Sequence, residues 1–228
     1  MTTSKTLVRT SVAAAIAVSA ALGLGACGDS SSGDLSTASA NVDHSAPAPT
    51  ATVAAVSGGS SAVALDAGFT DALTSLGLTP GTVGTATLAN GSVSFPITGG
   101  TVTLYDKNTG YRPFVQGVLL HEGSGLSLTA GSTTVELTDF TIDPGDPARL
   151  FGNVSVNGQL AAASAPLFDL DGSTLEPITM NSDGAAVLTG THVLVSPEAA
   201  ALLDKTFDTT AVKGGLLVGV ATLTVNTK

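Results

Sequence analysis

The chain has 228 residues, of which 43% are hydrophobic and only 11% charged, against about 25% charged in typical soluble domains. Eighteen acidic residues outweigh eight basic ones, so the formal net charge is −10. This balance excludes the basic footprint that phosphate backbones require, and two Tyr without Trp offer few platforms for stacking bases. We therefore expect no nucleic acid among the partners. The single cysteine, Cys27, excludes an internal disulfide and a cysteine-based zinc site.

Residues 1–26 have the pattern of an export signal. Lys5 and Arg9 give it a positive start, and an uninterrupted run of small and apolar residues spans Val12–Leu24. That run is short for a membrane-spanning helix, which needs about 20 apolar residues. The tetrad that follows, Leu24–Cys27, resembles a bacterial lipobox, in which signal peptidase II cleaves before the cysteine and the thiol carries diacylglycerol. The sequence predicts an exported lipoprotein, anchored through Cys27 to the outer face of the cytoplasmic membrane or the cell surface. An ordinary secretory signal is the alternative.

Residues 27–61 are low in complexity. Ser, Ala, Thr, Gly and Pro dominate them, and such a segment cannot bury enough apolar surface to offset the loss of chain entropy. We predict a lipidated flexible tether here, which holds the domain of residues 62–228 away from the membrane.

Two helices are expected in that domain. In residues 65–77, Leu and Phe recur at helical spacing between Asp66, a good N-cap, and Gly77, a good stop. The second helix begins after Ser196 as N-cap, with Pro at its first position, and runs to about Lys205.

The rest of the domain reads as strands. Short runs rich in Val, Thr and Ile alternate with turn dipeptides such as Asn90-Gly91 and Asn157-Gly158. The expected strands cover residues 84–88, 93–97, 101–105, 133–142, 150–156, 159–163, 166–170, 185–194 and 216–225, with a turn at 79–81. About ten short strands with two short helices predict an all-β, mainly antiparallel fold, either a two-sheet sandwich or a flattened barrel.

The stretch Phe114–Leu128 is the centre of the functional hypothesis. It predicts a hairpin, with an apolar strand, a glycine-rich turn and a second strand. His121 would lie at the apex of the turn beside Glu122, where neighbouring glycines permit close approach of a ligand. A solvated hairpin histidine without a function is the alternative.

The other motifs in the sequence do not indicate an enzyme. No Gly-x-Ser-x-Gly elbow lies between a strand and a helix, and Ser124 sits in the expected turn. The segment 169–176 lacks the spacing of a calcium loop. His192 alternates with apolar neighbours, as strand residues at a core edge do. Three acids, Asp139, Asp143 and Asp146, are either a weak cation site or an ordinary acidic loop.

Three segments together carry a family resemblance. Phe69-Thr70-Asp71-Ala72 lies on the first helix, Phe95-Pro96 on a strand, and residues 117–123 with Leu126 in the hairpin. This order resembles the HtaA domain, a β-sandwich haem-binding module of actinobacterial surface proteins. The similarity spans roughly residues 65–170.

The resemblance implies a haem site with a changed ligand set. The resemblance implies that a tyrosine on the helix ligates haem iron and that the turn histidine forms a hydrogen bond with this tyrosine. The matching positions are Ala72, which has no donor atom, and His121. Haem would then need His121 as axial ligand, or Tyr105 or Tyr111 reaching in.

We therefore take Phe69, Tyr111 and His121 as candidate ligand-binding residues, with His121 a metal ligand only if haem binds. The expected function is a membrane-anchored module that binds haem or another apolar ligand. The alternative is a structural or protein-interaction lipoprotein of the cell envelope without a small-molecule ligand.

Overall fold

The computed structural model describes residues 46–228. The export signal, Cys27 and most of the expected tether lie outside the described residues. No helix within residues 46–228 has both the length and the apolar character that a membrane span requires.

The described residues form one 13-stranded sheet, in the order β1-β6-β7-β8-β9-β10-β12-β13-β2-β5-β4, with β11 paired to β12 and β3 to β7. The strands are β1 Ala51–Val53, β2 Gly59–Leu65, β3 Thr79–Gly84, β4 Thr87–Ala89, β5 Ser92–Pro96, β6 Gly99–Leu104, β7 Val115–Ala130, β8 Thr133–Asp143, β9 Arg149–Val156, β10 Gln159–Asp171, β11 Thr179–Met180, β12 Ala186–Val195 and β13 Leu217–Val225. A 3-10 turn, η1 Lys107–Thr109, lies in the loop between β6 and β7.

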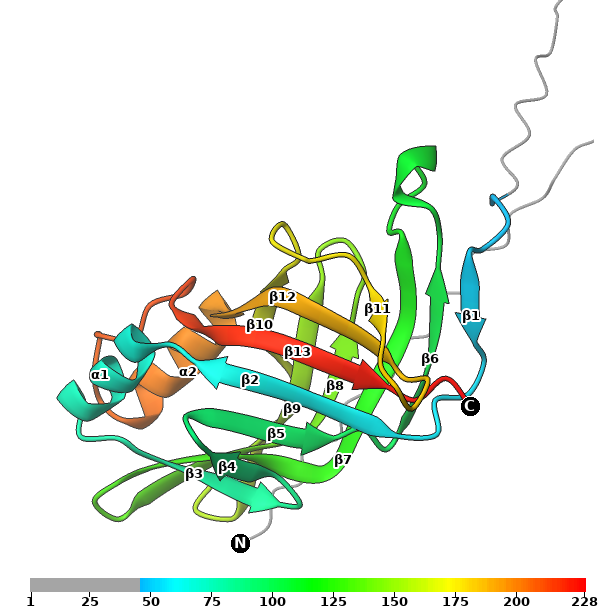
Figure 1. Ribbon diagram of the computed structural model, residues 1–228. Helices are drawn as coiled ribbons and strands as arrows, with labels where there is room; N and C mark the ends of the chain where they lie inside the picture. The colour runs from blue at the N-terminus through cyan, green and yellow to red at the C-terminus, as the bar shows by residue number, and fades with distance from the viewer. Residues whose placement is uncertain (1–45) are drawn as a thin grey trace, which may run out of the picture. The chain divides into compact units, whose positions relative to one another are not determined.

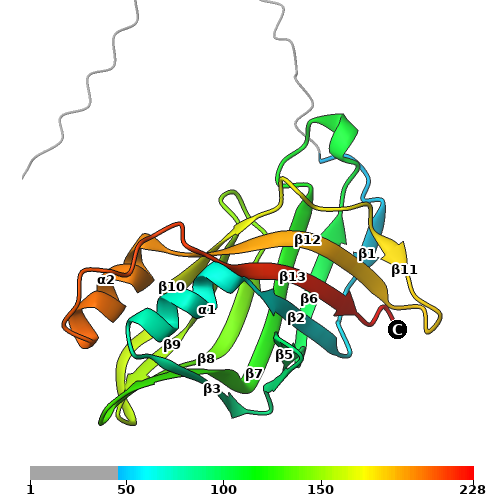
Figure 2. The same cartoon turned by 60° about the vertical axis from the view of Figure 1, so that its left-hand side comes forward.

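The sheet curls so that β12, β13 and β2 lie opposite β7, β8 and β9 (Figures 1 and 2). Both views place the two helices at one end of the curl and the β6–β7 loop with β1 and β11 at the other. Every recorded strand pairing is antiparallel, as the short connections require. The predicted fold class, all-β and mainly antiparallel with two short helices, is confirmed. The strands form one continuous curled sheet.

Both helices begin where their capping residues predict. Helix α1 (Ala67–Ser75) starts after Asp66, whose carboxylate accepts hydrogen bonds from the Gly68 and Phe69 amides. Helix α2 (Pro197–Thr206) starts after Ser196, whose hydroxyl oxygen accepts from the Ala199 amide. These caps satisfy amide groups that the first helical turn leaves without partners.

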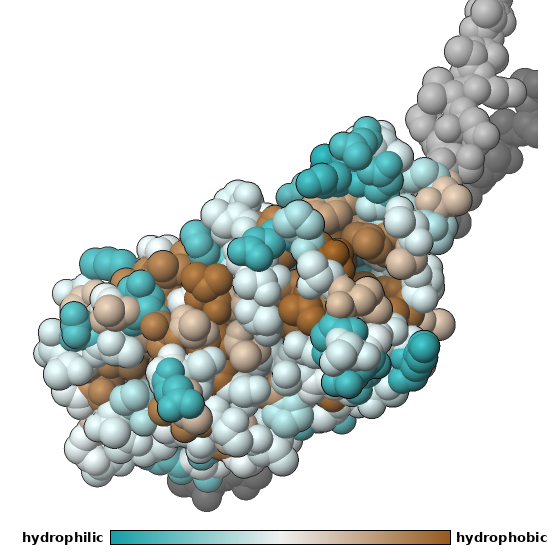
Figure 3. All heavy atoms as spheres, in the orientation of Figure 1, coloured by the Kyte–Doolittle hydropathy of each residue, from teal (hydrophilic) through white to brown (hydrophobic). Residues whose placement is uncertain are grey.

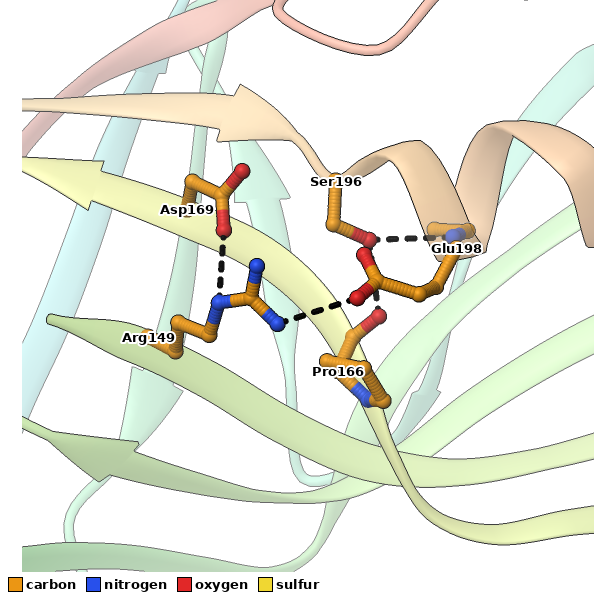
Figure 4. A network of polar contacts seen from close by, with 6 residues as sticks. Arg149, Pro166, Asp169, Ser196 and Glu198 are labelled. Atoms are coloured by element: carbon orange, nitrogen blue, oxygen red, sulfur yellow. Dashed lines mark hydrogen bonds and ion pairs between the residues drawn. The ribbon is translucent and has the colours of Figure 1, made fainter. Parts of the chain in front are cut away.

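An ion-pair network fixes α2 on the sheet (Figure 4). Arg149 Nε of β9 lies 3.0 Å from Asp169 Oδ1, a close charge contact whose angle is too poor for an aligned hydrogen bond. Arg149 Nη1 donates to Glu198 Oε1 at 3.1 Å, and Ser196 Oγ donates to the Pro166 carbonyl at 2.7 Å. The pKa of Glu198 is lowered, first by a hydrogen bond from its own backbone N–H and then by Arg149. The start of α2 is therefore tied to β9 and β10.

Two hydrophobic clusters divide the interior. The larger one joins both helices to the sheet, through residues such as Leu73, Phe140, Leu167, Val195 and Leu203. The smaller one consists of Val56, Ile97, Leu119, Ile142 and Val225. We call the helix-covered region the closed end of the sheet, and the region around the smaller cluster the open end.

The expected hairpin at Phe114–Leu128 is wrong. Strand β7 runs without reversal through the glycine-rich stretch and pairs with β8 on both sides of it. A bulge between His121 and Gly125 takes up the extra residues, with Gly123 at φ 69°. The Asp139 carboxylate accepts a hydrogen bond from the Gly123 amide, in place of the strand-to-strand hydrogen bond that the bulge interrupts. The small residues allow a bend in the strand, where the sequence suggested a turn.

The expected tether and the expected turn at 79–81 also need correction. Strand β1 and the start of β2 lie within residues 27–61, with Val56 and Ser61 buried. Residues 79–84 form β3, which pairs with β7. In both places, backbone hydrogen bonds from a neighbouring strand order a segment whose own composition favours a loop.

Candidate ligand-binding site

A cavity of about 820 Å³ lies inside the open end of the curled sheet. Its wall comes from both halves of the curl, including β6, β7 and β8 on one side and β11, β12 and β13 on the other. Figure 3 shows apolar atoms gathered in a hollow below the polar loop that carries η1. The volume falls within the range of about 300–1,000 Å³ typical of small-molecule sites.

The lining is overwhelmingly hydrocarbon. Phe114, Leu119, Ile178 and Leu188 are among its apolar members. Arg112 and Asp146 are the charged lining residues among those the structure describes. Such a surface suits an apolar molecule, with polar recognition confined to a few groups.

His121 lies at the wall of this cavity, in the middle of β7, and is 1% exposed. Its Nδ1 lies 3.2 Å from the Phe140 carbonyl oxygen, and its Nε2 lies 2.8 Å from Ser61 Oγ. A carbonyl oxygen only accepts, so we assign the ring proton to Nδ1, and Nε2 accepts from the Ser61 hydroxyl. Both ring nitrogens are thus satisfied within the protein.

Burial sets the protonation of this histidine. Desolvation lowers the pKa of His121 below its ordinary value, while the hydrogen bond to Phe140 acts weakly in the opposite direction. The neutral ring is therefore the form that the folded protein stabilises. It links β2 to β7 across the interior.

The Ser61–His121 pair has the spacing of a nucleophile and its base. Ser61 is only 5% exposed, and it lies on a strand that pairs with neighbours on both sides. Ser61 and His121 both line the cavity, but the His121 Nδ1 that a triad carboxylate would bind donates to the Phe140 carbonyl instead. The geometry accounts for a buried polar contact rather than a reacting pair.

Of the three predicted binding residues, the structure places one on the cavity. Phe69 lies on α1 and packs against the larger cluster, and no residue of α1 lines the cavity. Tyr111 stacks edge-on against Tyr105, with ring centroids 4.7 Å apart, in the loop between β6 and β7. Neither tyrosine lines the cavity. The structure thus separates Phe69 and Tyr111 from His121.

Sequence reasoning missed two residues of this site, Ser61 and Arg112. Ser61 and Val63 are two residues apart and lie on the same inward face of β2. This alternation is visible in the sequence, but the low-complexity residues around Ser61 obscure it. Arg112 follows Tyr111 in the same loop and reaches the cavity where Tyr111 does not. Its approach depends on the fold of the loop, which no sequence period encodes.

The remaining acids have structural roles. The Asp139 carboxylate also accepts from Thr138 and Asn153, and hydrogen bonds, led by that from Gly123, lower its pKa. Asp143 accepts from the Gly145 amide in the following turn. Within residues 46–228, no three His, Cys, Asp or Glu side chains gather as a metal site would require.

No known family profile and no curated protein sequence matches this chain. Among solved structures, the chain is similar to the C-terminal domain of HtaA from Corynebacterium glutamicum. The TM-score is 0.51 at 13% sequence identity, over 75% of this chain and 99% of that domain.

The class of fold is therefore HtaA-like, and the distant resemblance inferred from three sequence segments is confirmed at this level. Identity this low establishes the shared fold alone. Ala72, the position that the sequence resemblance matches to the family's tyrosine, lies on a helix that does not line the cavity. The residue that takes up the hydrogen bond of His121 is Ser61.

Proposed function

We propose that this protein is an exported, membrane-anchored binding module that holds an apolar ligand inside the open end of its curled sheet. The single observation that carries this proposal is the hydrocarbon-lined cavity of about 820 Å³. Burial of apolar area is the main stabilising term in folding, and the apolar wall of an empty cavity does not contribute to it. Large uncovered apolar surfaces therefore indicate binding sites.

The binding of an apolar molecule is tested with the neutral dye Nile red and the full chain carrying Cys27→Ser, which removes the acylated thiol. We expect a saturable rise in fluorescence, lost when the cavity is filled by Leu188→Trp. Absence of saturable binding would contradict the proposal and favour the alternative, an envelope lipoprotein that engages another protein.

Haem is the ligand that the HtaA resemblance implies, and its test is a haemin titration followed at the Soret band. His121 can ligate iron only after its Nε2 loses the hydrogen bond from the Ser61 hydroxyl and the cavity wall opens. Met180, an exposed residue of β11, brings a thioether to the lining without that cost. If haemin binds, we expect Met180→Leu to change its spectrum more than His121→Gln does.

The membrane anchor is tested separately. A palmitate analogue supplied to cells should label the wild-type chain and not the Cys27→Ser chain. Equal labelling of both chains would show that the anchor, if any, is elsewhere.

A further inference from the structure

We propose that the occupant of the cavity is a single-chain fatty acid, with its hydrocarbon tail inside the curl and its carboxylate on Arg112. This inference rests on the proposed binding function and names the chemical class of ligand. It starts from the one cationic side chain that the lining contains among the described residues.

Arg112 is held in a fixed orientation at the cavity. Its Nη1 donates to two backbone carbonyls, that of Lys107 at 3.1 Å and that of Tyr111 at 2.9 Å. Its guanidinium carbon lies 5.8 Å from the centroid of the Phe114 ring, within the range of a cation–π contact. These contacts leave little freedom for the side chain to lose when a ligand binds.

The opposite edge of the guanidinium remains available. Within residues 46–228, Nε and Nη2 of Arg112 have no hydrogen-bond acceptor, and the ion pairs are those of Arg149. Together, Nε and Nη2 form a fork that matches the two oxygens of a carboxylate. Phe114, against which the guanidinium lies, also lines the cavity, so apolar surface begins beside the fork.

The lining favours an acyl chain over haem as the body of this ligand. Haem iron needs an axial donor, and because Ser61 and Phe140 occupy the ring nitrogens of His121, the lining offers mainly the thioether of Met180. The two tyrosines of the loop face each other outside the lining. A hydrocarbon tail needs no polar partner in the interior, and each methylene that it buries contributes about 0.8 kcal/mol.

Asp146 also lines the cavity and is not paired with Arg112 in the described part of the chain. It would repel a carboxylate near the fork, so its removal should tighten binding. This gives the proposal two substitutions with opposite expected signs.

The test compares a fluorescent fatty acid, cis-parinaric acid, with the corresponding alcohol, both titrated into the full chain carrying Cys27→Ser at pH 8. We expect the acid to bind at least about tenfold more tightly than the alcohol. Arg112→Gln should reduce that ratio to near one, Arg112→Lys to an intermediate value, and Asp146→Asn should raise it. Lys213→Gln, which removes an exposed charge in the segment between α2 and β13, is the matched control and should leave the ratio unchanged.

The outcomes separate this inference from the proposed function. Equal binding of acid and alcohol, unaffected by Arg112→Gln, would overturn the fatty-acid assignment and leave an apolar-ligand module. Tight haemin binding that excludes cis-parinaric acid in competition would also overturn it. Failure of Nile red, acid and alcohol alike would overturn the binding function itself.

Discussion

The two ends of the curled sheet are built largely from the same strands, but helices cover one end and a cavity occupies the other. At the closed end, α1 and α2 bring Leu73 and Leu203 onto the sheet and complete a continuous core. At the open end, inward-facing residues of these strands line a cavity, and the hydrophobic cluster there has only five buried residues. The difference shows that one sheet can devote one end to stability and leave the other for a ligand. His121 and Ser61 are buried polar residues on the cavity wall, between the two ends.

The strongest test of this comparison is Leu167→Ala at the closed end. Leu167 is 1% exposed and belongs to the larger cluster, so its truncation should reduce the free energy of unfolding by about 2–5 kcal/mol. Urea denaturation measures the loss. Leu160→Ala is the matched control, because Leu160 lies on the same strand but is 64% exposed, and we expect a change within about 0.5 kcal/mol. Similar losses for both would contradict the assignment of the core.

The next effect concerns the boundary between the ends. His121→Gln should destabilise the fold by about 1–3 kcal/mol, because it disturbs the buried hydrogen bonds to Ser61 and Phe140. Cis-parinaric acid binding by the folded fraction should stay within about twofold, because both ring nitrogens of His121 are occupied within the protein and offer the carboxylate no donor. A complete loss of binding in a folded variant would show that His121 contacts the ligand.

The same residue predicts a pH dependence. Because the folded pKa of His121 is lowered, the unfolded chain takes up its proton at a higher pH than the folded chain does. The stability tied to the neutral ring is therefore complete above about pH 6.5 and is lost as pH falls from there through the lowered folded value. Urea titrations at pH 7.5 and 5.5 should show this loss in the wild type and a smaller one in His121→Gln. Asp139 also has a lowered pKa, but its contribution is lost only at more acidic pH.

A smaller loss is expected at the cap of α2. Ser196→Ala removes the acceptor for the Ala199 amide and the donor to the Pro166 carbonyl, and should cost about 0.5–2 kcal/mol. Ser196→Thr, which keeps a hydroxyl, should recover part of that stability. Thermal unfolding followed by circular dichroism compares the three chains, and an alanine variant as stable as the wild type would argue against the cap.

The smallest change in stability, with the largest change in binding, is expected at the open end. Leu188→Trp places a large ring on the face of β12 where Ala186 and Leu188 alternate along the lining beside empty space, so stability should change by less than about 1 kcal/mol. Nile red binding should be lost because the ring occupies the cavity. Leu88→Trp, at an exposed position of β4 away from the lining, should leave binding intact. Retained binding in Leu188→Trp would place the ligand elsewhere.

The local parts of the fold were predictable from sequence. Asp66 and Ser196 are N-caps in the structure as their side chains predict, and Asn157-Gly158 forms the turn between β9 and β10. These features depend on interactions within a few residues, so composition and spacing carry them. The all-β class followed from the same signals, whereas the HtaA-like fold was expected from the resemblance of three sequence segments to that family.

The course of β7 was not predictable in this way. Glycines near His121 suit a tight turn and a bulge equally well, and the choice between them depends on Asp139 of β8. The strands at residues 51–61 were missed for a similar reason, since Ser and Ala adopt strand geometry there only because β6, β5 and β13 pair with them.

The sequence by itself determined the acidic composition, the export and lipobox pattern around Cys27, the capped helices and the antiparallel β class, because each depends on neighbouring residues or on totals. The tertiary structure alone decided that His121 is sealed by Ser61, that Phe69 and Tyr111 lie away from it, and that Arg112 borders the cavity. The physical reason is that a cavity is a property of how strands curl around one another. Residues 60 positions apart, such as Ser61 and His121, meet only through that curl.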